Sequence, residues 1–370
     1  RDDAGCFQAP LAHLILSSPR SGIMQAPLLP STATSSLSLS FGSCIRSAPR
    51  IQRCLVRMAD QKADLQRVDA SVRLAEGPAF CTYRGCHAYD HIYAISDLHT
   101  DYALNYDWVQ QAAPEKAESS VLLVAGDVSD RISVFEKTME VLAEAFGAVF
   151  FVPGNHDLWV RHDGSEGKDS LQKMRKLDNI CEALGVLTTP QRVRMASGST
   201  ISICPLLSFH HFSFDTEPDV PYLRLPSARA TVTDFRATQW PNGLSLGDEA
   251  LAVHLDACNE QLPERAAQQA QQAAACGRLG LEPIVSWREA REGSSRVLSF
   301  SHFLPRIELM PEKRYLVYPD LMKAAGSKPL GRRVSDLHPN VHLFGHSHFG
   351  WDATLDDGIR YVQAPLATPN

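Results

Sequence analysis

Residues 121–131 (VLLVAGDVSDR) join a short apolar run directly to a cluster of polar residues. An uninterrupted apolar run of this length is typical of a β-strand that is buried on both faces, as in a parallel sheet. The Gly-Asp pair that follows the run is typical of a turn. Because ligands bind open α/β sheets at the carboxyl ends of the strands, we expect Asp127 to lie at such an edge.

Four other apolar runs also end in polar residues. The motifs that follow them are Asp-x-His from Asp97, Gly-Asn-His-Asp from Gly154, Ser-His from Ser301 and Gly-His-x-His from Gly345. All five clusters are therefore expected to converge on one crevice. The corresponding strands are expected at residues 91–96, 148–152, 297–300 and 341–344, with further strands at residues 200–204 and 359–363.

Helical patterns alternate with these strands. Apolar residues recur every three or four positions in residues 132–146 and again in residues 171–184, so each segment has one apolar stripe along a helix. Gly147 and Gly185 stand where C-terminal caps belong. Strands that alternate with helices predict an α/β fold built from βαβ units.

One later segment has a different composition. Residues 262–295 begin with an Ala/Gln-rich stretch and continue with a polar segment. We interpret this segment as a solvated helix and loop inserted into the fold, and not as a second domain.

The overall composition excludes several classes of protein. The chain has 370 residues, 44% of them hydrophobic and 21% charged, which excludes a wholly disordered chain. Its formal net charge of −6 gives no sign of the basic surface that nucleic-acid binding requires. No apolar run approaches the roughly 18 residues of a membrane-spanning helix, so we expect a soluble protein without membrane contact.

The nine cysteines are scattered, and no two have CxxC spacing. This pattern argues against a disulfide framework and against a structural zinc site, although pairing of Cys81 with Cys86 stays open. It favours a reducing, intracellular compartment, which we take to be the cytoplasm. The sequence indicates nothing about the oligomeric state.

The N-terminal residues differ from the rest of the chain. Residues 4–59 contain no Asp or Glu but are rich in serine and include five arginines, which is typical of a transit peptide and would direct the chain to a plastid or a mitochondrion. Alternatively, residues 1–57 are not translated and Met58 begins the chain. Either interpretation makes residues 1–87 an extension, a leader or a disordered segment outside the fold, and residues 88–370 the functional domain.

The polar clusters contain the ligands of a particular group of metals. They offer carboxylates, imidazoles and one amide but no thiolate, which favours Mn²⁺, Fe, Zn²⁺ or Mg²⁺. Each cluster taken alone is also explained by a turn or by a solvated polar pair. Together they provide too many donors for one ion, whereas two ions about 3.5–4 Å apart would use them all.

The order of the five motifs resembles that of the calcineurin-like metallophosphoesterase superfamily. The matching blocks extend from Asp97 to His348, and jointly they are specific to the superfamily but not to a subfamily. The resemblance implies an α/β fold in which two mixed β-sheets pack face to face as a sandwich, with helices outside.

The resemblance also implies a role for each motif residue. Asp127 would bridge two divalent metal ions, and a hydroxide between the ions would attack phosphorus in line. His156 would act as the general acid and Asp157 would orient it. The first metal would be held by Asp97, His99 and His348, and the second by Asn155, His302 and His346.

Other residues are candidates for substrate contacts. Arg131 matches the family's Gly-Asp-x-x-Asp-Arg block, but an ion pair with Asp130 or Asp101 explains it equally well. Arg161 stands just past Gly-Asn-His-Asp and is a candidate for phosphate binding. The remaining candidates, which would line the substrate mouth or pack in the core, are His210 and His211.

We therefore expect a di-metal phosphoesterase, with a catalytically inactive scaffold of the same fold as the alternative. The superfamily includes enzymes for monoesters, diesters, nucleotides and phosphoproteins. Here Asp157-Leu158-Trp159 follows His156, where protein phosphatases continue with an extended Arg-Gly signature. This departure favours a phosphorylated small molecule or a nucleotide over a phosphoprotein as the substrate.

Overall fold

The computed structural model describes residues 12–13, 88–161, 169–220, 226–241 and 243–369. All of them belong to one compact unit, formed by residues 1–14 and 82–370. The transit-peptide interpretation and the Cys81–Cys86 pair lie outside the described residues, so both stay predictions. Among the residues that the structure does describe, no helix is both long and apolar enough to cross a bilayer.

The first of two sheets contains the decisive stretch of sequence. Its strand order is β1-β2-β3-β4, formed by Ala12–His13, His91–Ile95, Ser120–Ala125 and Ala148–Val152. Strands β2, β3 and β4 run parallel, whereas β1 pairs with β2 in antiparallel orientation. Ala12 and His13 therefore belong to the first sheet, which corrects the expectation that all of residues 1–87 lie outside the fold. Every residue of β3 is buried, as its uninterrupted apolar sequence predicts.

The second sheet has the strand order β10-β11-β9-β8-β6-β5-β7. Its central strands are parallel, and β5, β7 and β10 are antiparallel to their neighbours. Both sheets are therefore mixed, which confirms the expected fold class. The strands are β5 (Gln191–Arg194), β6 (Thr200–Pro205), β7 (Leu281–Pro283), β8 (Arg296–Phe300), β9 (Val341–Leu343), β10 (Trp351–Thr354) and β11 (Arg360–Gln363).

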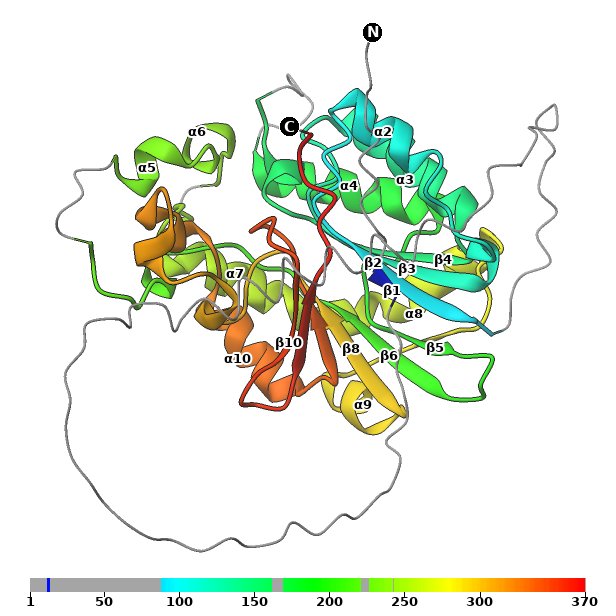
Figure 1. The fold of residues 1–370 in the computed structure, drawn as a ribbon. Helices are drawn as coiled ribbons and strands as arrows, with labels where there is room; N and C mark the ends of the chain where they lie inside the picture. The colour runs from blue at the N-terminus through cyan, green and yellow to red at the C-terminus, as the bar shows by residue number, and fades with distance from the viewer. Residues whose placement is uncertain (1–11, 14–87, 162–168, 221–225, 242, 370) are drawn as a thin grey trace, which may run out of the picture. The chain divides into compact units, whose positions relative to one another are not determined.

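Helices lie outside the sheets, as Figure 1 shows. The α-helices are α2 (Ala103–Val109), α3 (Ile132–Ala145), α4 (Ser170–Leu184), α5 (Ala228–Thr231), α6 (Asp234–Ala237), α7 (Glu249–Asn259), α8 (Leu262–Ala275), α9 (Trp287–Glu292) and α10 (Lys328–Leu337). Short 3-10 helices are η2 (Ala117–Ser119), η3 (His156–Leu158), η4 (Phe212–Phe214), η5 (Ile307–Leu309), η6 (Lys313–Tyr315) and η7 (Pro319–Ala324).

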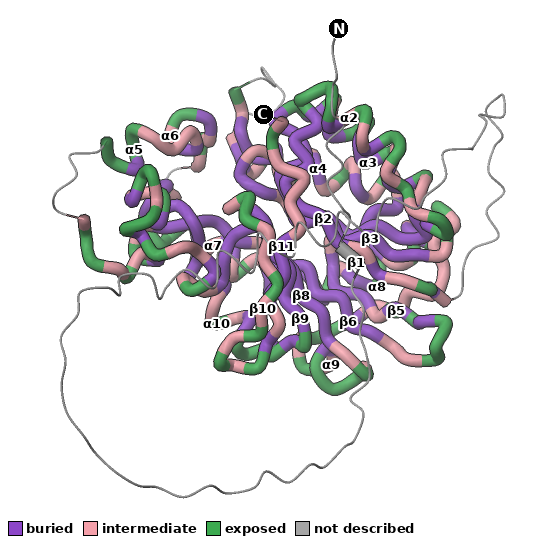
Figure 2. Tube along the Cα trace, viewed as in Figure 1, coloured by how far each residue is buried: buried purple, intermediate pink, exposed green. Residues whose placement is uncertain are grey.

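The apolar stripes of the helices face the sheets. Phe135 and Met139 of α3 are fully buried and belong to a core cluster with Leu122 and Val124 of β3. On the opposite face of β3, Val121 and Leu123 are also buried, so both faces of the first sheet are covered. Figure 2 shows buried strands at the centre and exposed outer faces on α2 and α3.

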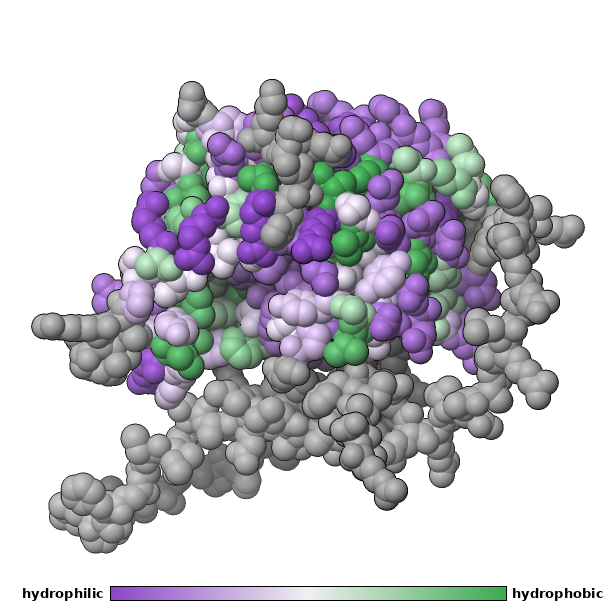
Figure 3. All heavy atoms as spheres, turned by 90° about the horizontal axis from the view of Figure 1, so that it is seen from above, coloured by the Kyte–Doolittle hydropathy of each residue, from purple (hydrophilic) through white to green (hydrophobic). Residues whose placement is uncertain are grey.

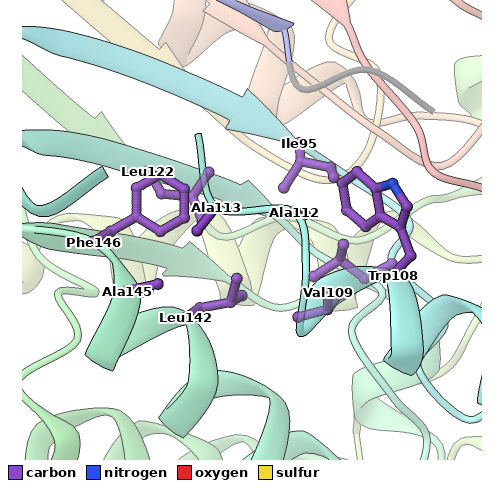
Figure 4. Close-up of a pocket in the computed structure, with 10 residues that line it drawn as sticks. Ile95, Trp108, Val109, Ala112, Ala113, Leu122, Leu142, Ala145 and Phe146 are labelled. Carbon is purple, nitrogen blue, oxygen red and sulfur yellow. The ribbon is translucent and has the colours of Figure 1, made fainter. Parts of the chain in front are cut away.

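One narrow gap remains in this packing. Figure 4 shows it between Trp108, Ile95, Leu142 and Phe146, where α2 and α3 meet the first sheet. Its lining is almost entirely apolar and its volume is only about 10 Å³, at the lower limit for one water molecule. We therefore interpret it as a packing defect and not as a ligand site.

The segment 262–295 is more closely integrated than its composition indicates. Helix α8 is amphipathic, and the buried side chain of Gln269 binds the backbone of Thr188 and Thr189. Strand β7 then pairs with β5 and extends the second sheet. The expectation of a solvated helix and loop is therefore wrong for this part of the segment, because alanines and one glutamine at helical spacing bury a full face.

Hydrophobic side chains also reach the surface. Leu104 and Val317 are 70% and 80% exposed, respectively. On the face shown in Figure 3, however, hydrophobic residues are interspersed with hydrophilic ones. This face therefore presents no single broad apolar area among the described residues.

Candidate active site

The five polar clusters do converge, because they follow strands whose carboxyl ends meet at one edge. Asp97, Asp127 and Asn155 come after β2, β3 and β4 of the first sheet. The histidines of the second sheet come after β8 and β9. The two sets are joined directly, since the His346 amide donates to Asp97 Oδ1 at 2.9 Å. The site therefore lies where the two sheets meet.

Four of the side chains form a compact group that could hold a metal ion. One ligand atom from each of Asp97, His99, Asp127 and His348 lies within 4.8 Å of the others. The Nε2 atoms of His99 and His348 are 3.1 Å apart, and His348 Nε2 lies 3.4 Å from Asp97 Oδ1. Carboxylate oxygens and imidazole nitrogens facing one point are the donor set of a divalent ion.

The remaining three side chains form a second group beside the first. Asn155 Oδ1 lies 3.0 Å from both His302 Nε2 and His346 Nδ1. Asp127 Oδ2 lies 3.4 Å from His302 Nε2 and 4.0 Å from His99 Nε2, so it stands between the two groups. This is the arrangement that a bridging carboxylate requires.

Hydrogen bonds to the backbone orient two of these imidazoles. His302 Nδ1 lies 2.9 Å from the Ala125 carbonyl, and His346 Nε2 lies 2.9 Å from the Ala324 carbonyl. A carbonyl accepts only, so these ring nitrogens donate and, in the neutral ring, the opposite nitrogens carry the lone pairs. Those nitrogens face Asn155 and Asp127, so the neutral rings fit a metal ion.

The electrostatic field of the site favours cations. Burial lowers the pKa of His302, but the Asp127 and Asp97 carboxylates and the hydrogen bond to the Ala125 carbonyl together raise it to about 9. Burial likewise raises the pKa of Asp97, yet its contact with His348 brings it down to about 2. Both carboxylates are thus negatively charged at neutral pH, in a buried position where a positive charge is strongly favoured.

Five candidate ligands have an uncommon backbone conformation. Asp97, His99, Asp127, His346 and His348 have positive φ values of 54°, 44°, 56°, 74° and 57°. This left-handed region is disfavoured for residues with a side chain, although Asp and His tolerate it better than most. Such strain gathers at functional sites, where the surrounding structure holds it in place.

Two glycines allow the loops to approach each other. Gly126 has a φ of 81°, and a Cβ there would lie 2.6 Å from His302 Nδ1. A Cβ on Gly154 would overlap the Asp127 carboxylate. Any larger residue at either position would therefore displace a candidate ligand.

His156 stands beside the two groups and faces solvent. Its Nε2 atom is 3.9 Å from Asp127 Oδ2, and its ring stacks on Trp159 with centroids 3.6 Å apart. The His156 side chain is 27% exposed. It borders a cavity of about 140 Å³ that is also lined by His99, Asp101, Tyr102, Asp130, Arg131 and Arg161.

Comparison with known proteins agrees with this geometry. The calcineurin-like phosphoesterase family matches residues 91–252, which contain four of the seven candidate ligands and His156. Over residues 91–252, this chain is thus similar to the calcineurin-like phosphoesterase family.

One related protein, PptH, is similar to this chain in both sequence and structure. The acyl-carrier-protein phosphodiesterase PptH of Mycobacterium tuberculosis is 31% identical over 125 residues, which are 33% of this chain and 38% of PptH. The crystal structure of the phosphopantetheinyl hydrolase PptH from that organism aligns with a TM-score of 0.56 at 20% identity. That alignment covers 76% of this chain and 91% of the other, so the two share the phosphoesterase fold.

Asp157 does not contact the His156 imidazole in the way the sequence led us to expect. Its two carboxylate oxygens accept hydrogen bonds at 2.8–3.0 Å from the amides of Asp127, Val128, Ser129 and Gly154. Asp157 is fully buried, and its carboxylate is occupied by these donors. It therefore shapes the loop that presents Asp127, which corrects the predicted role.

The arginine candidates both lie at the cavity of the phosphoesterase domain. Arg161 is held by Asp130 Oδ2 at 2.6 Å and by the face of Trp159. Arg131 is exposed at the cavity wall. Its backbone amide binds Ser129. Arg161 is thus fixed in place, whereas Arg131 is exposed at the cavity.

The two neighbouring histidines have different surroundings. His211 is buried, and its ring binds Ser213 Oγ and the amide of Lys328 at 2.9 Å each. His211 is therefore a packing residue. His210 is also buried, but its Nε2 lies 2.8 Å from Asp234 Oδ2, and Asp234 in turn contacts Asn155. Neither lines the described cavity, so of the two alternatives for these histidines the structure favours packing over the substrate mouth.

Sequence reasoning missed three buried residues that support the site. The Lys173 ammonium donates to the carbonyls of Asp130 and Trp159 and so ties two site loops together. Trp159 was noted only for its departure from the protein-phosphatase signature. Asp234 lies in TVTDFRA, a segment without an apolar strand before it. No local signal distinguishes Asp234 or Lys173 from a surface charge.

Proposed function

We propose that this chain hydrolyses phosphate esters at a centre of two divalent metal ions. The observation that carries the proposal is the convergence of seven donors from both sheets on two adjacent points, with His156 beside them at an open cavity. A fold that served only as a scaffold would need neither the strained ligand loops nor a histidine at the cavity.

The residues divide into two ligand groups around Asp127. Asp97, His99 and His348 would hold one ion, and Asn155, His302 and His346 would hold the other. When bound, two such ions lower the pKa of a water molecule to about 7 and neutralise the charge of a phosphate. The chemistry of the donors suits Mn²⁺, Fe, Zn²⁺ or Mg²⁺.

His156 has the geometry of a general acid. Its ring is exposed to the cavity, and stacking on Trp159 fixes the plane of the imidazole. A protonated His156 can give its Nε2 proton to the ester oxygen of the leaving group as the P–O bond breaks.

We further propose a phosphodiester attached to a carrier protein as the substrate. PptH, which shares 31% identity with residues of this domain, is named as an acyl-carrier-protein phosphodiesterase. The candidate site is compatible with such a substrate because the cavity beside His156 opens at the surface. This proposal differs from the small-molecule or nucleotide substrate that the sequence favoured.

Metal-dependent turnover is the first test. The purified protein is stripped with a chelator, supplied with Mn²⁺ and assayed on paired chromogenic mono- and diesters. We expect hydrolysis only with metal, near abolition in Asp127→Asn, and unchanged activity in Asp107→Asn, whose side chain is exposed on α2. Two metal ions per chain without hydrolysis of any ester would support the scaffold instead.

The role of His156 is tested by its own substitution. We expect His156→Ala to lower kcat by a factor of about 10²–10⁴ while the metal content stays at two ions per chain. His254→Ala on α7, remote from the site in the chain, serves as the matched control. Equal kcat in His156→Ala and the parent protein would rule out this general acid.

The carrier-protein substrate is tested with holo-acyl carrier protein. Mass spectrometry of the carrier protein would show loss of the phosphopantetheinyl group, and Asp127→Asn would leave the group in place. Turnover of simple diesters without any release from holo-acyl carrier protein would refute this substrate while leaving the phosphoesterase activity intact.

A further inference from the structure

Asp234 is a buried carboxylate that contacts three residues around the site. It is the first residue of α6 and is completely shielded from solvent. Its Oδ1 atom accepts hydrogen bonds from Asn155 Nδ2 at 2.9 Å and from Trp159 Nε1 at 2.7 Å. Its Oδ2 atom lies 2.8 Å from His210 Nε2. One oxygen thus binds both a candidate ligand and the tryptophan under His156.

We infer that Asp234 is a positioning residue that fixes the Asn155 ligand and the Trp159–His156 stack through this one oxygen. The inference deepens the proposed function and rests on it, since it concerns the same metal centre. The segment between β6 and β8 contains none of the five motifs, and the inference gives it the role of positioning residues of the site.

The first arm of this arrangement determines which end of the Asn155 amide faces the centre. Asp234 can only accept, so Asn155 must turn its NH₂ group toward Asp234. The amide oxygen then points to His302 and His346, at 3.0 Å from each. Without the acceptor, the amide could rotate and turn its donors toward the centre, where a cation would be repelled. Carboxylates behind metal ligands commonly contribute a factor of about 10–100 to metal affinity.

The second arm holds the indole of Trp159. Its N–H group is satisfied by Asp234, and its face carries the His156 ring at 3.6 Å. Arg161 also packs over the indole, with Cζ 4.4 Å from the ring centroid. The indole is thus held by a hydrogen bond at its edge and by ring contacts, and its tilt determines where His156 points.

Asp234 is itself held firmly. His210 has no hydrogen-bond partner at Nδ1 among the described residues, and its ring packs against those of Phe209 and Phe303. The backbone fixes α6 as well, because Val160 N donates to Ala237 O at 2.8 Å and Ser170 N to Gln239 O at 2.7 Å.

Two substitutions separate positioning from bulk packing. Asp234→Ala removes the acceptor of both arms. Asp234→Asn retains an oxygen at the Oδ1 position, and its NH₂ group can donate to His210 Nε2 in the other tautomer of that ring. Asp234→Asn should therefore keep the hydrogen bonds to Asn155 and Trp159 that Asp234→Ala loses. Asp107→Asn on the exposed face of α2 is the matched control for loss of a charge.

Equilibrium dialysis measures the binding of Mn²⁺ to the full chain after its metal has been removed. We expect Asp234→Ala to bind one ion as the parent protein does and the second at least about tenfold more weakly. Asp234→Asn should recover most of this loss. Binding of both ions with parent affinity in Asp234→Ala, or equal loss of both ions, would overturn the inference.

Tryptophan emission gives a second readout that needs no substrate. The contribution of Trp159 is the difference between the parent protein and Trp159→Phe. We expect this contribution to change in Asp234→Ala and to return in Asp234→Asn, and an unchanged contribution in Asp234→Ala would contradict the second arm. If Asp234→Ala does not fold, Asp234→Ser, whose hydroxyl is too short to reach both donors, is measured in the same way.

These readouts distinguish the inference from the proposed function. Weaker binding of the second ion in Asp234→Ala, in a parent protein that hydrolyses no ester, would support the positioning role and refute the phosphoesterase. Hydrolysis by the parent protein together with full Mn²⁺ binding by Asp234→Ala would support the phosphoesterase and refute the positioning role of Asp234.

Discussion

The imidazole of His342 is buried in β9 between two serine hydroxyls. Ser299 Oγ lies 2.8 Å from Nδ1, and Ser301 Oγ lies 3.1 Å from Nε2. The alternation of His342 with Phe344 in the sequence indicated such a buried, hydrogen-bonded residue. Burial lowers the pKa of His342 to about 3, against 6.5 for an exposed histidine. The folded protein therefore holds this ring neutral where the unfolded chain protonates it.

This difference predicts that stability falls in acid. The contribution of His342 is complete above pH 6.5 and is lost progressively as the pH falls toward 3, because the unfolded state binds the additional proton. At pH 5 the loss should be about 2 kcal/mol. His342→Gln has no such proton, so the stability difference between it and the parent should shrink by that amount from pH 7.5 to pH 5.

Guanidinium unfolding curves with chelator present provide the measurement. The chelator keeps metal binding out of the comparison, and the other histidines titrate alike in both proteins. A stability difference that stays constant between the two pH values would contradict the assigned state of His342.

Residue types alone did not reveal the partners of buried charges. Asp157 stands next to His156 in the sequence, which led us to assign it to that ring, yet its oxygens bind four backbone amides. Adjacent side chains on a 3-10 turn point in different directions, so closeness in sequence is a poor guide to contact. Asp234, 79 positions from Asn155, is the residue that contacts it.

At the scale of elements, the seven predicted strands match β2, β3, β4, β6, β8, β9 and β11 to within about one residue, because buried strands leave a continuous apolar run. The antiparallel strands β1, β5, β7 and β10 were not predicted. The end of α3 was less predictable. Gly147 was expected as its cap, but the helix ends at Ala145 with Phe146 extended. Gly147 is required because a Cβ there would lie 2.5 Å from the Glu118 carbonyl. Gly185, with a φ of 69°, does cap α4 as expected.

Helix α8 provides a prediction about how its segment is attached. Gln269 Oε1 accepts hydrogen bonds from the amides of Thr188 and Thr189 at 2.7 and 2.9 Å. Gln269→Ala would leave two buried donors without a partner, so we expect it to lower the unfolding free energy by about 2–4 kcal/mol. The neighbouring Gln268 is exposed, and Gln268→Ala should change it by less than about 0.5 kcal/mol.

The denaturant midpoints of Gln269→Ala and Gln268→Ala, each measured against the parent protein, compare the two losses of stability. Equal, small effects would mean that α8 is the solvated addition that its composition indicated. A large effect restricted to Gln269 would show that the segment is part of the folded unit.

At the scale of the whole molecule, the candidate metal centre joins the two sheets. Asp97, Asp127 and Asn155 belong to the first sheet, and the histidines after β8 and β9 belong to the second. Ions bound between them would stabilise the folded state, because an unfolded chain cannot bring these groups together. The stabilisation should be about 2.7 kcal/mol per site at a metal concentration one hundred times the Kd.

Thermal unfolding with Mn²⁺ and with chelator tests this link. We expect the Tm to fall on metal removal in the parent protein and in Asp107→Asn, and to respond much less in Asp127→Asn. A Tm that does not depend on metal in the parent protein would argue against a centre that spans the sheets.

The sequence by itself determined the strands, the polar residues at their ends and the metal chemistry of those residues. These features are local, since strand periodicity, turn residues and ligand types are each written within a few consecutive positions. Only the tertiary structure decided that Asp157 holds the Asp127 loop, that His211 packs in the core and that Asp234 contacts Asn155 and Trp159. A buried polar group must find a partner, and which partner lies within reach depends on how distant segments fold together.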